Sequence, residues 1–322
     1  MKRRSFNTFA LGGLATLAAP AIQAQAYPTK PIRVVVPFPP GAATDTIARA
    51  FSQAVATSIG QPVVVENKAG ADGAIAGTEV ARAAPDGHTL LFATNSPMSA
   101  VPALKKNPPY DPVRDFAPVS DIGRYTFFMV VHPSVPAKTV AELVAYAKAN
   151  PGKLSYATGN TTGIVSTALF NALGGIQMVQ VPYKGEPQAL TDLIAGRVQF
   201  MVVSAGTSIG HIRDGRLRAI AVTLTKRSPA APEVPTIAEA GMPKFSLTSW
   251  AAVFAPAGTP PDIVARLNKE FNAAMSRPEV MSVMEKQSFM LNGSTPEQLG
   301  TLVREQLESF RSTLKIAGVE PE

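Results

Sequence analysis

Residues 34–45 read VVVPFPPGAATD, a short apolar run that passes through a Pro-Pro-Gly turn directly into a helical pattern. The run before the turn predicts a buried strand over residues 32–36. After the turn, Ile47, Phe51 and Val55 recur every four residues, which predicts a helix with one buried face. Residues 154–164, LSYATGNTTGI, repeat this strand–turn–helix order later in the chain. These two units indicate an α/β protein.

The two turns are candidate anion-binding loops. Backbone N–H groups in the first turn of a helix lack intrahelical partners and carry the positive end of the helix dipole. The same pattern also describes two ordinary capped helices, and spacing alone does not choose between the two interpretations. Asp45 is left out, because its carboxylate suits a helix start and could cap the Ala42 N–H but would repel an anion. The anion-loop candidates are Gly41, Ala42, Ala43 and Thr44 in the first loop, and Thr158, Gly159, Asn160, Thr161 and Thr162 in the second. Phe38 is either a cleft wall for an apolar or aromatic part of a ligand or a residue that packs beneath the first loop.

Alternation of β-branched runs with helical periodicity continues along the chain and predicts mainly parallel sheets. Further strands are expected over residues 62–65 and 89–93, with a helix over 74–84. Thr139, Thr259 and Thr295 each open a capping-box pattern, which predicts three more helix starts. The last of these helices is expected to reach about residue 317.

Polar residues follow three further predicted strands, at the carboxyl ends where open α/β sheets place their ligands. Asn95 and Ser96 follow residues 90–93, where a simple turn before Pro97 is the alternative. Tyr183 and Lys184 follow residues 179–182, and Lys184 is either a cleft cation or an ordinary surface charge. Ser204 follows residues 199–203.

The N-terminus has the pattern of a secretory signal peptide over residues 1–26. Lys2, Arg3 and Arg4 precede an apolar stretch over residues 6–22, and an Ala-x-Ala site ends at Ala26. We expect cleavage before Tyr27 and export to the periplasm, with a membrane anchor as the alternative and the Sec or twin-arginine route left open. Cleavage lowers the 30 Lys and Arg to 27 against 23 Asp and Glu, so the net charge falls from +7 to +4.

Composition excludes several functions. The absence of Cys excludes disulfides, thiolate metal sites and cysteine nucleophiles, and the three His stand far apart with no metal-ligand spacing. Residues 70–77 spell GxxGxxxG, which is not the dinucleotide fingerprint, and no P-loop occurs. No basic run with interleaved aromatic residues indicates nucleic-acid binding. We expect no metal, no cofactor and no catalytic residue.

Eight segments in order carry a resemblance to a known family. They are PFPPGAATD (37–45), GADGAIAG (70–77), PDGHTL (85–90), YDPVRDFAPV (110–119), VPYKG (181–185), GRLRAIAVT (215–223), VPTIAEAG (234–241) and APAGTPPDIVARLN (255–268). Together they resemble the Bug family of periplasmic solute receptors, the substrate-binding proteins of tripartite tricarboxylate transporters.

The resemblance implies a two-domain periplasmic-binding-protein (Venus-flytrap) fold with a ligand cleft between the domains. Residues 27–125 and 248–322 would form domain 1, and residues 126–247 domain 2. It also implies that loops at the two helix starts hold a small carboxylate, either a di- or tricarboxylate or an aromatic or pyridine carboxylate. The protein, expected to be a monomer, would deliver this ligand to the membrane permease subunits.

Two other functions remain open at this point. A receptor of this kind could instead report ligand to a sensor kinase ectodomain, which the sequence does not distinguish from transport. An exported hydrolase is less well supported, because the chain has no GxSxG and no suitably placed His. The family usually shows Gly-Gly where this chain has Gly41-Ala42, and a Ser-Gly-x-Gly-Ser-like second loop where it has residues 158–162. These departures predict that the accepted ligand substituents differ from those of commoner members.

Overall fold

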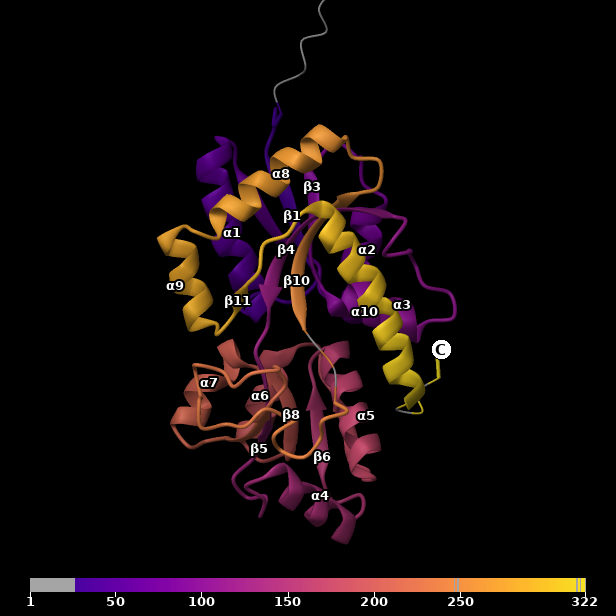
Figure 1. The fold of residues 1–322 in the computed structure, drawn as a ribbon, viewed down its shortest axis with the longest axis vertical. Coiled ribbons are helices and arrows are strands. Elements are labelled where there is room, and N and C mark those ends of the chain that lie inside the picture. Colours follow the sequence, from indigo (N-terminus) through magenta and orange to yellow (C-terminus); the bar gives the residue numbers. More distant parts are fainter. Residues whose placement is uncertain (1–26, 246, 248, 317, 319, 322) are drawn as a thin grey trace, which may run out of the picture.

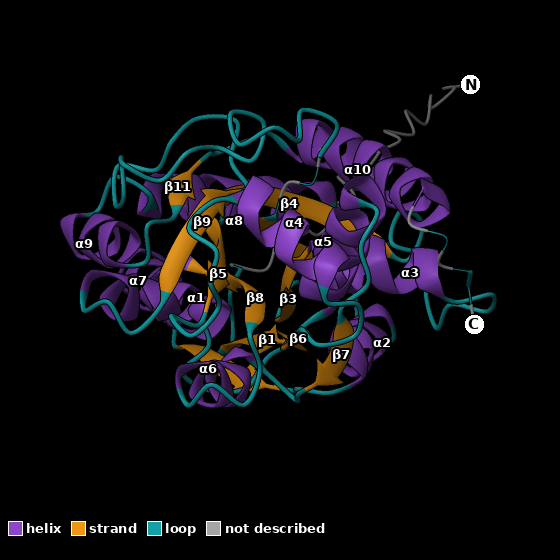
Figure 2. Ribbon diagram, turned by 90° about the horizontal axis from the view of Figure 1, so that it is seen from below, coloured by secondary structure: helices purple, strands orange, loops and turns teal. Residues whose placement is uncertain are grey.

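Two mixed β-sheets, each covered by helices, follow one another along the long axis of the molecule (Figure 1). This computed structural model describes residues 27–245, 247, 249–316, 318 and 320–321. We call the elements around the first sheet the first lobe and those around the second sheet the second lobe. Figure 2, viewed along the long axis from the second lobe, shows the strands enclosed by helices.

The first sheet has the strand order β11-β4-β10-β3-β1-β2. Its strands are β1 (Ile32–Val36), β2 (Val63–Asn67), β3 (Thr89–Thr94), β4 (Phe116–Arg124), β10 (Trp250–Pro256) and β11 (Met290–Leu291). Its helices are α1 (Ala43–Ile59), α2 (Ala74–Ala81), α3 (Val101–Leu104), α8 (Pro261–Ala274), α9 (Pro278–Lys286) and α10 (Pro296–Ile316), with short helical turns at Ala71–Gly73 and Ser96–Ala100.

The second sheet has the order β7-β6-β8-β5-β9. Its strands are β5 (Phe127–Val131), β6 (Ser155–Thr158), β7 (Val179–Pro182), β8 (Phe200–Ser204) and β9 (Arg218–Val222). Its helices are α4 (Val140–Ala149), α5 (Thr161–Gly174), α6 (Glu186–Ile194) and α7 (Ala205–Arg213).

The prediction of mainly parallel sheets is wrong. Strands β2, β1 and β3 are parallel, as are β7, β6 and β8. However, β10 runs antiparallel to both β3 and β4, and β5 runs antiparallel to both β8 and β9. Strand β4, being antiparallel to β10, runs in the same direction as β1, β2 and β3. The parallel order is broken by β10, through which the chain returns to the first sheet, and by β5, through which it enters the second.

The core of the first lobe confirms the helical face read from the sequence. Ile47, Phe51 and Val55 of α1 are buried, and Phe51 lies between Phe92 of β3 and Phe271 of α8, with both ring centroids 6.4 Å away. Apolar area removed from water stabilises a fold by roughly 25 cal/mol per Å². The packing of α1 therefore holds the start of this helix in a set position at the end of β1.

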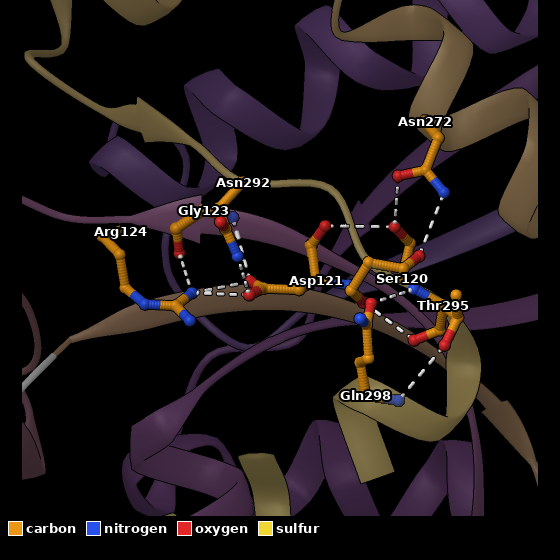
Figure 3. Close-up of polar contacts among 9 residues, drawn as sticks. Ser120, Asp121, Gly123, Arg124, Asn272, Asn292, Thr295 and Gln298 are labelled. Atoms are coloured by element: carbon orange, nitrogen blue, oxygen red, sulfur yellow. Dashed lines mark hydrogen bonds and ion pairs between the residues drawn. The ribbon is translucent and has the colours of Figure 1, made fainter. Parts of the chain in front are cut away.

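Two neighbouring chain segments connect the lobes. Only Tyr125 and Thr126 separate β4 from β5, and the Tyr125 N–H donates to the Ser249 carbonyl oxygen, 3.0 Å away, just before β10. Close by, the Asp121 carboxylate of β4 accepts hydrogen bonds from Arg124 and from Asn292 Nδ2 (Figure 3). This network fastens the segment before α10 to the strand that leads out of the first lobe.

Helix starts and ends follow the sequence with two exceptions. The reciprocal capping bonds predicted at Thr295 are present with Gln298, and Thr139 Oγ1 accepts the Glu142 N–H. Thr259 is not a cap: α8 begins one residue later, after Pro260, and the Thr259 hydroxyl donates to the Pro256 carbonyl oxygen in a turn. Helix α2 ends at Ala81, short of the predicted residue 84.

Two predictions concern residues at the chain ends. The predicted signal peptide, residues 1–26, lies outside the described residues, as does residue 317 at the expected end of α10. Within the part of the chain that the structure describes, no helix combines the length and apolar character needed to cross a bilayer.

Candidate ligand-binding site

A cavity lies between the two lobes, with walls from both. The first lobe supplies Phe38, Pro39, Ala42, Ala43, Thr44, Thr94, Ser96 and Ser249; the segment that crosses between the lobes supplies Tyr125 and Phe127; and the second lobe supplies Gly159, Asn160, Thr162, Gly185, Glu186 and Ser204.

The start of α1 forms one wall. Ala42 is the N-cap residue, and its methyl group cannot cap the N–H groups of the first turn. Ala42, Ala43 and Thr44 of this turn line the cavity, so the positive end of the helix dipole lies at its wall. Gly41 precedes them with a φ of 82°, a conformation that favours glycine.

Asp45 sits in this turn without facing the cavity. Its carboxylate accepts hydrogen bonds from the Gly41 N–H, from Arg49 and from Asn67, so it caps Gly41 and not Ala42 as predicted. Burial tends to raise the pKa of Asp45, but these hydrogen bonds outweigh burial and lower it. The Asp45 carboxylate is thus ionised, and its hydrogen bonds are all to residues of its own lobe.

The start of α5 forms the opposite wall. Asn160 Oδ1 accepts the Gly163 N–H at 2.8 Å and caps this helix. The Thr162 hydroxyl accepts from Asn95 Nδ2 at 2.9 Å and lies 3.0 Å from Ser96 Oγ. Asn95 and Ser96 follow β3 of the first lobe, so these bonds join the two lobes directly across the cavity.

Glu186 and Tyr125 are the cavity residues that sequence reasoning missed most clearly. Glu186 is 7% exposed at the first position of α6, and burial raises the pKa of its carboxyl group. The Tyr125 hydroxyl donates to Thr44 Oγ1 at 2.8 Å, and burial raises its pKa as well. The other missed lining residues are Pro39, Thr94, Phe127, Gly185 and Ser249.

The sequence held a weak signal for Glu186. The predicted strand over residues 179–182 ends four residues before it, and Gly185-Glu186-Pro187 has the composition of a helix start. Tyr125 carried no comparable signal, because only the packing of the two lobes brings its ring beside the start of α1.

The structure separates the candidate residues into two groups. Those that line the cavity are Phe38, Ala42, Ala43, Thr44, Ser96, Gly159, Asn160, Thr162 and Ser204. Those that do not are Gly41, Asn95, Thr158, Thr161, Tyr183 and Lys184. Of the second group, Asn95 still supports the site, because it bonds both Thr162 and Ser249.

Tyr183 and Lys184 lie beside the cavity and not in it. The Tyr183 hydroxyl donates to Asp192 at 2.7 Å, and burial together with Asp192 raises its pKa to about 12. Lys184 is exposed and, with Tyr183, lines an adjoining depression opposite residues 69–73 of the first lobe. This depression shares Phe38 and Gly159 with the cavity, so the residues that follow the edge strand β7 lie at the interface between the lobes.

Charge and metal-ligand chemistry are sparse around the cavity. Among its lining residues in the described part of the chain, Glu186 and Tyr125 are the titratable side chains, and no Lys, Arg or His occurs. No group of three or more His, Cys, Asp or Glu in the described residues is placed to hold a metal ion. Trp250 is buried against Phe254, with ring centroids 6.3 Å apart, away from the lining.

Known proteins that resemble this chain identify its family. The sequence profile described as "Tripartite tricarboxylate transporter family receptor" matches residues 47–318. The chain belongs to this receptor family. BugT of Bordetella pertussis is 35% identical over 309 residues, which cover 95% of this chain and 94% of that relative.

Solved structures agree with the family assignment. The protein Rpa4515 of R. palustris, solved with adipate, has a TM-score of 0.87 and 34% identity, covering 92% of this chain and 100% of that one. MatC of Rhodopseudomonas palustris, solved with malate, has a TM-score of 0.85 and 32% identity, covering 89% and 100%. The receptor therefore has the fold of the periplasmic binding proteins, and it is a periplasmic solute-binding protein of its family.

Proposed function

We propose that this receptor captures a small carboxylate in the cavity between its lobes and delivers it to a tripartite tricarboxylate-type membrane permease. In this proposal residues 27–125 and 248–322 form one domain, residues 126–247 form the other, and the two close over the ligand. Ligand is bound and released unchanged, without catalysis.

One observation carries the proposal: the starts of α1 and α5, from opposite lobes, line the same cavity. A helix N-terminus is suited to a carboxylate because its free N–H groups and dipole both favour negative charge. A ligand held at both helix starts would also hold the lobes together, as in hinge closure. The titles of two solved relatives name carboxylates, adipate and malate, as their bound ligands.

Thermal unfolding of the chain over residues 27–322 tests this proposal. The protein is heated alone and with a panel of aliphatic and aromatic carboxylates, with sugars and nucleotides as controls. A ligand at 100 times its Kd adds about 2.7 kcal/mol to the free energy of unfolding, which raises the Tm visibly. Stabilisation by carboxylates alone, with the ligand recovered unchanged, supports the proposal, and stabilisation by sugars or nucleotides alone contradicts it.

A further inference from the structure

Glu186 is a buried carboxyl group that faces the cavity without a cationic partner there. Each described side-chain contact can donate to it: Asn160 Nδ2 at 3.1 Å, Ser204 Oγ at 2.5 Å and Thr207 Oγ1 at 3.3 Å. The amide orientation of Asn160 is set, because its Oδ1 accepts the Gly163 N–H of α5. Its Nδ2 must therefore donate, and Glu186 Oε1 acts as an acceptor.

The Glu186 carboxyl group lies at the helix starts of the second lobe, where an anionic ligand group would otherwise bind. It stands in the first turn of α6, and it contacts Asn160 and Ser204, the N-cap residues of α5 and α7. The start of α1 in the first lobe differs, because the carboxylate in its own first turn, Asp45, is bonded to Arg49 and Asn67. The protein thus provides its own carboxyl group on one side of the cavity and an open helix start on the other.

The charge balance of the cavity follows from this asymmetry. A ligand with carboxylates at both ends would bring a second negative charge toward Glu186, with no Lys, Arg or His among the described lining residues. Burial raises the pKa of Glu186, which is the response of a carboxyl group that lacks a counter-charge. A positive group beside Glu186 would restore the balance.

Building on the proposed function, we propose that Glu186 is a specificity-determining residue. It selects a ligand that carries one carboxylate, held at the start of α1, and one protonated nitrogen, held against Glu186. The titratable side chain that faces Glu186 in the cavity is Tyr125, whose pKa burial raises, so it stays neutral at physiological pH. The facing residues of α5, β8 and α7 offer amide and hydroxyl groups.

Calorimetric titration with matched ligand pairs tests this selection. Each pair has similar length and differs in one end group: γ-aminobutyrate and succinate, δ-aminovalerate and glutarate, ε-aminocaproate and adipate, and p-aminomethylbenzoate and terephthalate. We expect the wild type near neutral pH to bind the amino member of the pair that fits at least about tenfold more tightly. Glu186→Gln keeps the size of the side chain, removes its charge and should abolish or invert the preference. Glu308→Gln, which removes an exposed carboxylate on α10, should leave the preference unchanged.

The pH dependence gives a second readout that needs no variant. Both end groups of these ligands keep their charges between about pH 6.5 and pH 8, so a change in relative affinity within that window reports a group of the protein. Ionisation of Glu186 as the pH rises should strengthen binding of the amino member relative to the dicarboxylate, and the Gln variant should show a flat ratio.

Three outcomes would overturn the inference. Tighter binding of dicarboxylates by the wild type, or a preference that survives in Glu186→Gln, would show that Glu186 does not select the ligand. Stabilisation only by carboxylates that lack a protonated nitrogen would also reject it, while carboxylate capture itself would stand. If no carboxylate of any kind stabilises the protein, the proposed function fails, and the inference fails with it.

Discussion

At the scale of single residues, most of the polar side chains that line the cavity are hydroxyl groups. Two threonines of α5 show how position decides their roles. The Thr162 hydroxyl bonds Asn95 and lies beside Ser96 of the other lobe. Thr167 is fully buried one turn and a half further along, and its hydroxyl has no hydrogen-bond partner among the described residues.

Replacing these two threonines by valine should therefore have opposite consequences. Thr162→Val leaves the buried Asn95 amide without its acceptor, so we expect a loss of about 1–2 kcal/mol in the free energy of unfolding and several-fold weaker carboxylate binding. Thr167→Val removes a buried hydroxyl that makes no hydrogen bond to the described residues, so the free energy of unfolding should stay the same or rise and binding should not change. Urea denaturation and calorimetry measure both effects, and equal losses in the two variants would contradict the assigned role of Thr162.

At the scale of elements, the start of α1 depends on the backbone of Gly41. Its φ is 82°, and an added Cβ atom would meet no atom within 4 Å. Gly215 has a φ of 70° and equally open surroundings, in the turn between α7 and β9. The two glycines therefore differ in location while their local strain is alike.

We expect Gly41→Ala and Gly215→Ala to destabilise the protein by similar amounts, about 1–2 kcal/mol, because both force an L-residue into the left-handed region. Only Gly41→Ala should also weaken carboxylate binding, because relaxation of its strain moves the first-turn N–H groups of α1. Tm values and calorimetric Kd values distinguish the two effects. Loss of binding in both variants, or in neither, would argue against α1 as part of the ligand site.

At the scale of the whole molecule, proposed closure brings loops of the two lobes into contact at the rim of the cavity. A Cβ atom added to Gly185, at the start of α6, would lie 2.9 Å from Cγ of Pro39, before α1. Gly185 has a φ of −178°, which is extended backbone open to any residue. The natural chain contains no Cys, so an introduced pair would have no competing thiols.

A Pro39→Cys, Gly185→Cys double variant should form a disulfide that locks the lobes together, since the two Cβ atoms lie within bonding reach. Oxidation after loading should trap the carboxylate, and oxidation before loading should prevent its uptake. Ligand release measured with and without reductant, against each single variant, tests this expectation. Unchanged release from the fully oxidised protein would show that the lobes need not separate.

Much of the architecture was predictable because it rests on local pattern. The buried face of α1 and the caps at Thr139 and Thr295 depend on residues a few positions apart, where periodicity and capping act. The reversed direction of β5 and β10 was not predictable in this way, since it depends on the chain crossing between lobes. The predicted cap at Thr259 was also wrong, because its hydroxyl hydrogen-bonds the Pro256 carbonyl oxygen and not an N–H group of α8.

By itself, the sequence determined the fold class, the family and the two helix starts that face each other in the cavity. Each of these follows from short-range order or from several motifs in fixed succession. Only the tertiary structure decided which candidates line the cavity, placing Ser204 in it and Tyr183 beside it. It also decided that Glu186 and Tyr125 face the same space, because burial and contact between distant segments exist only once the lobes have packed together.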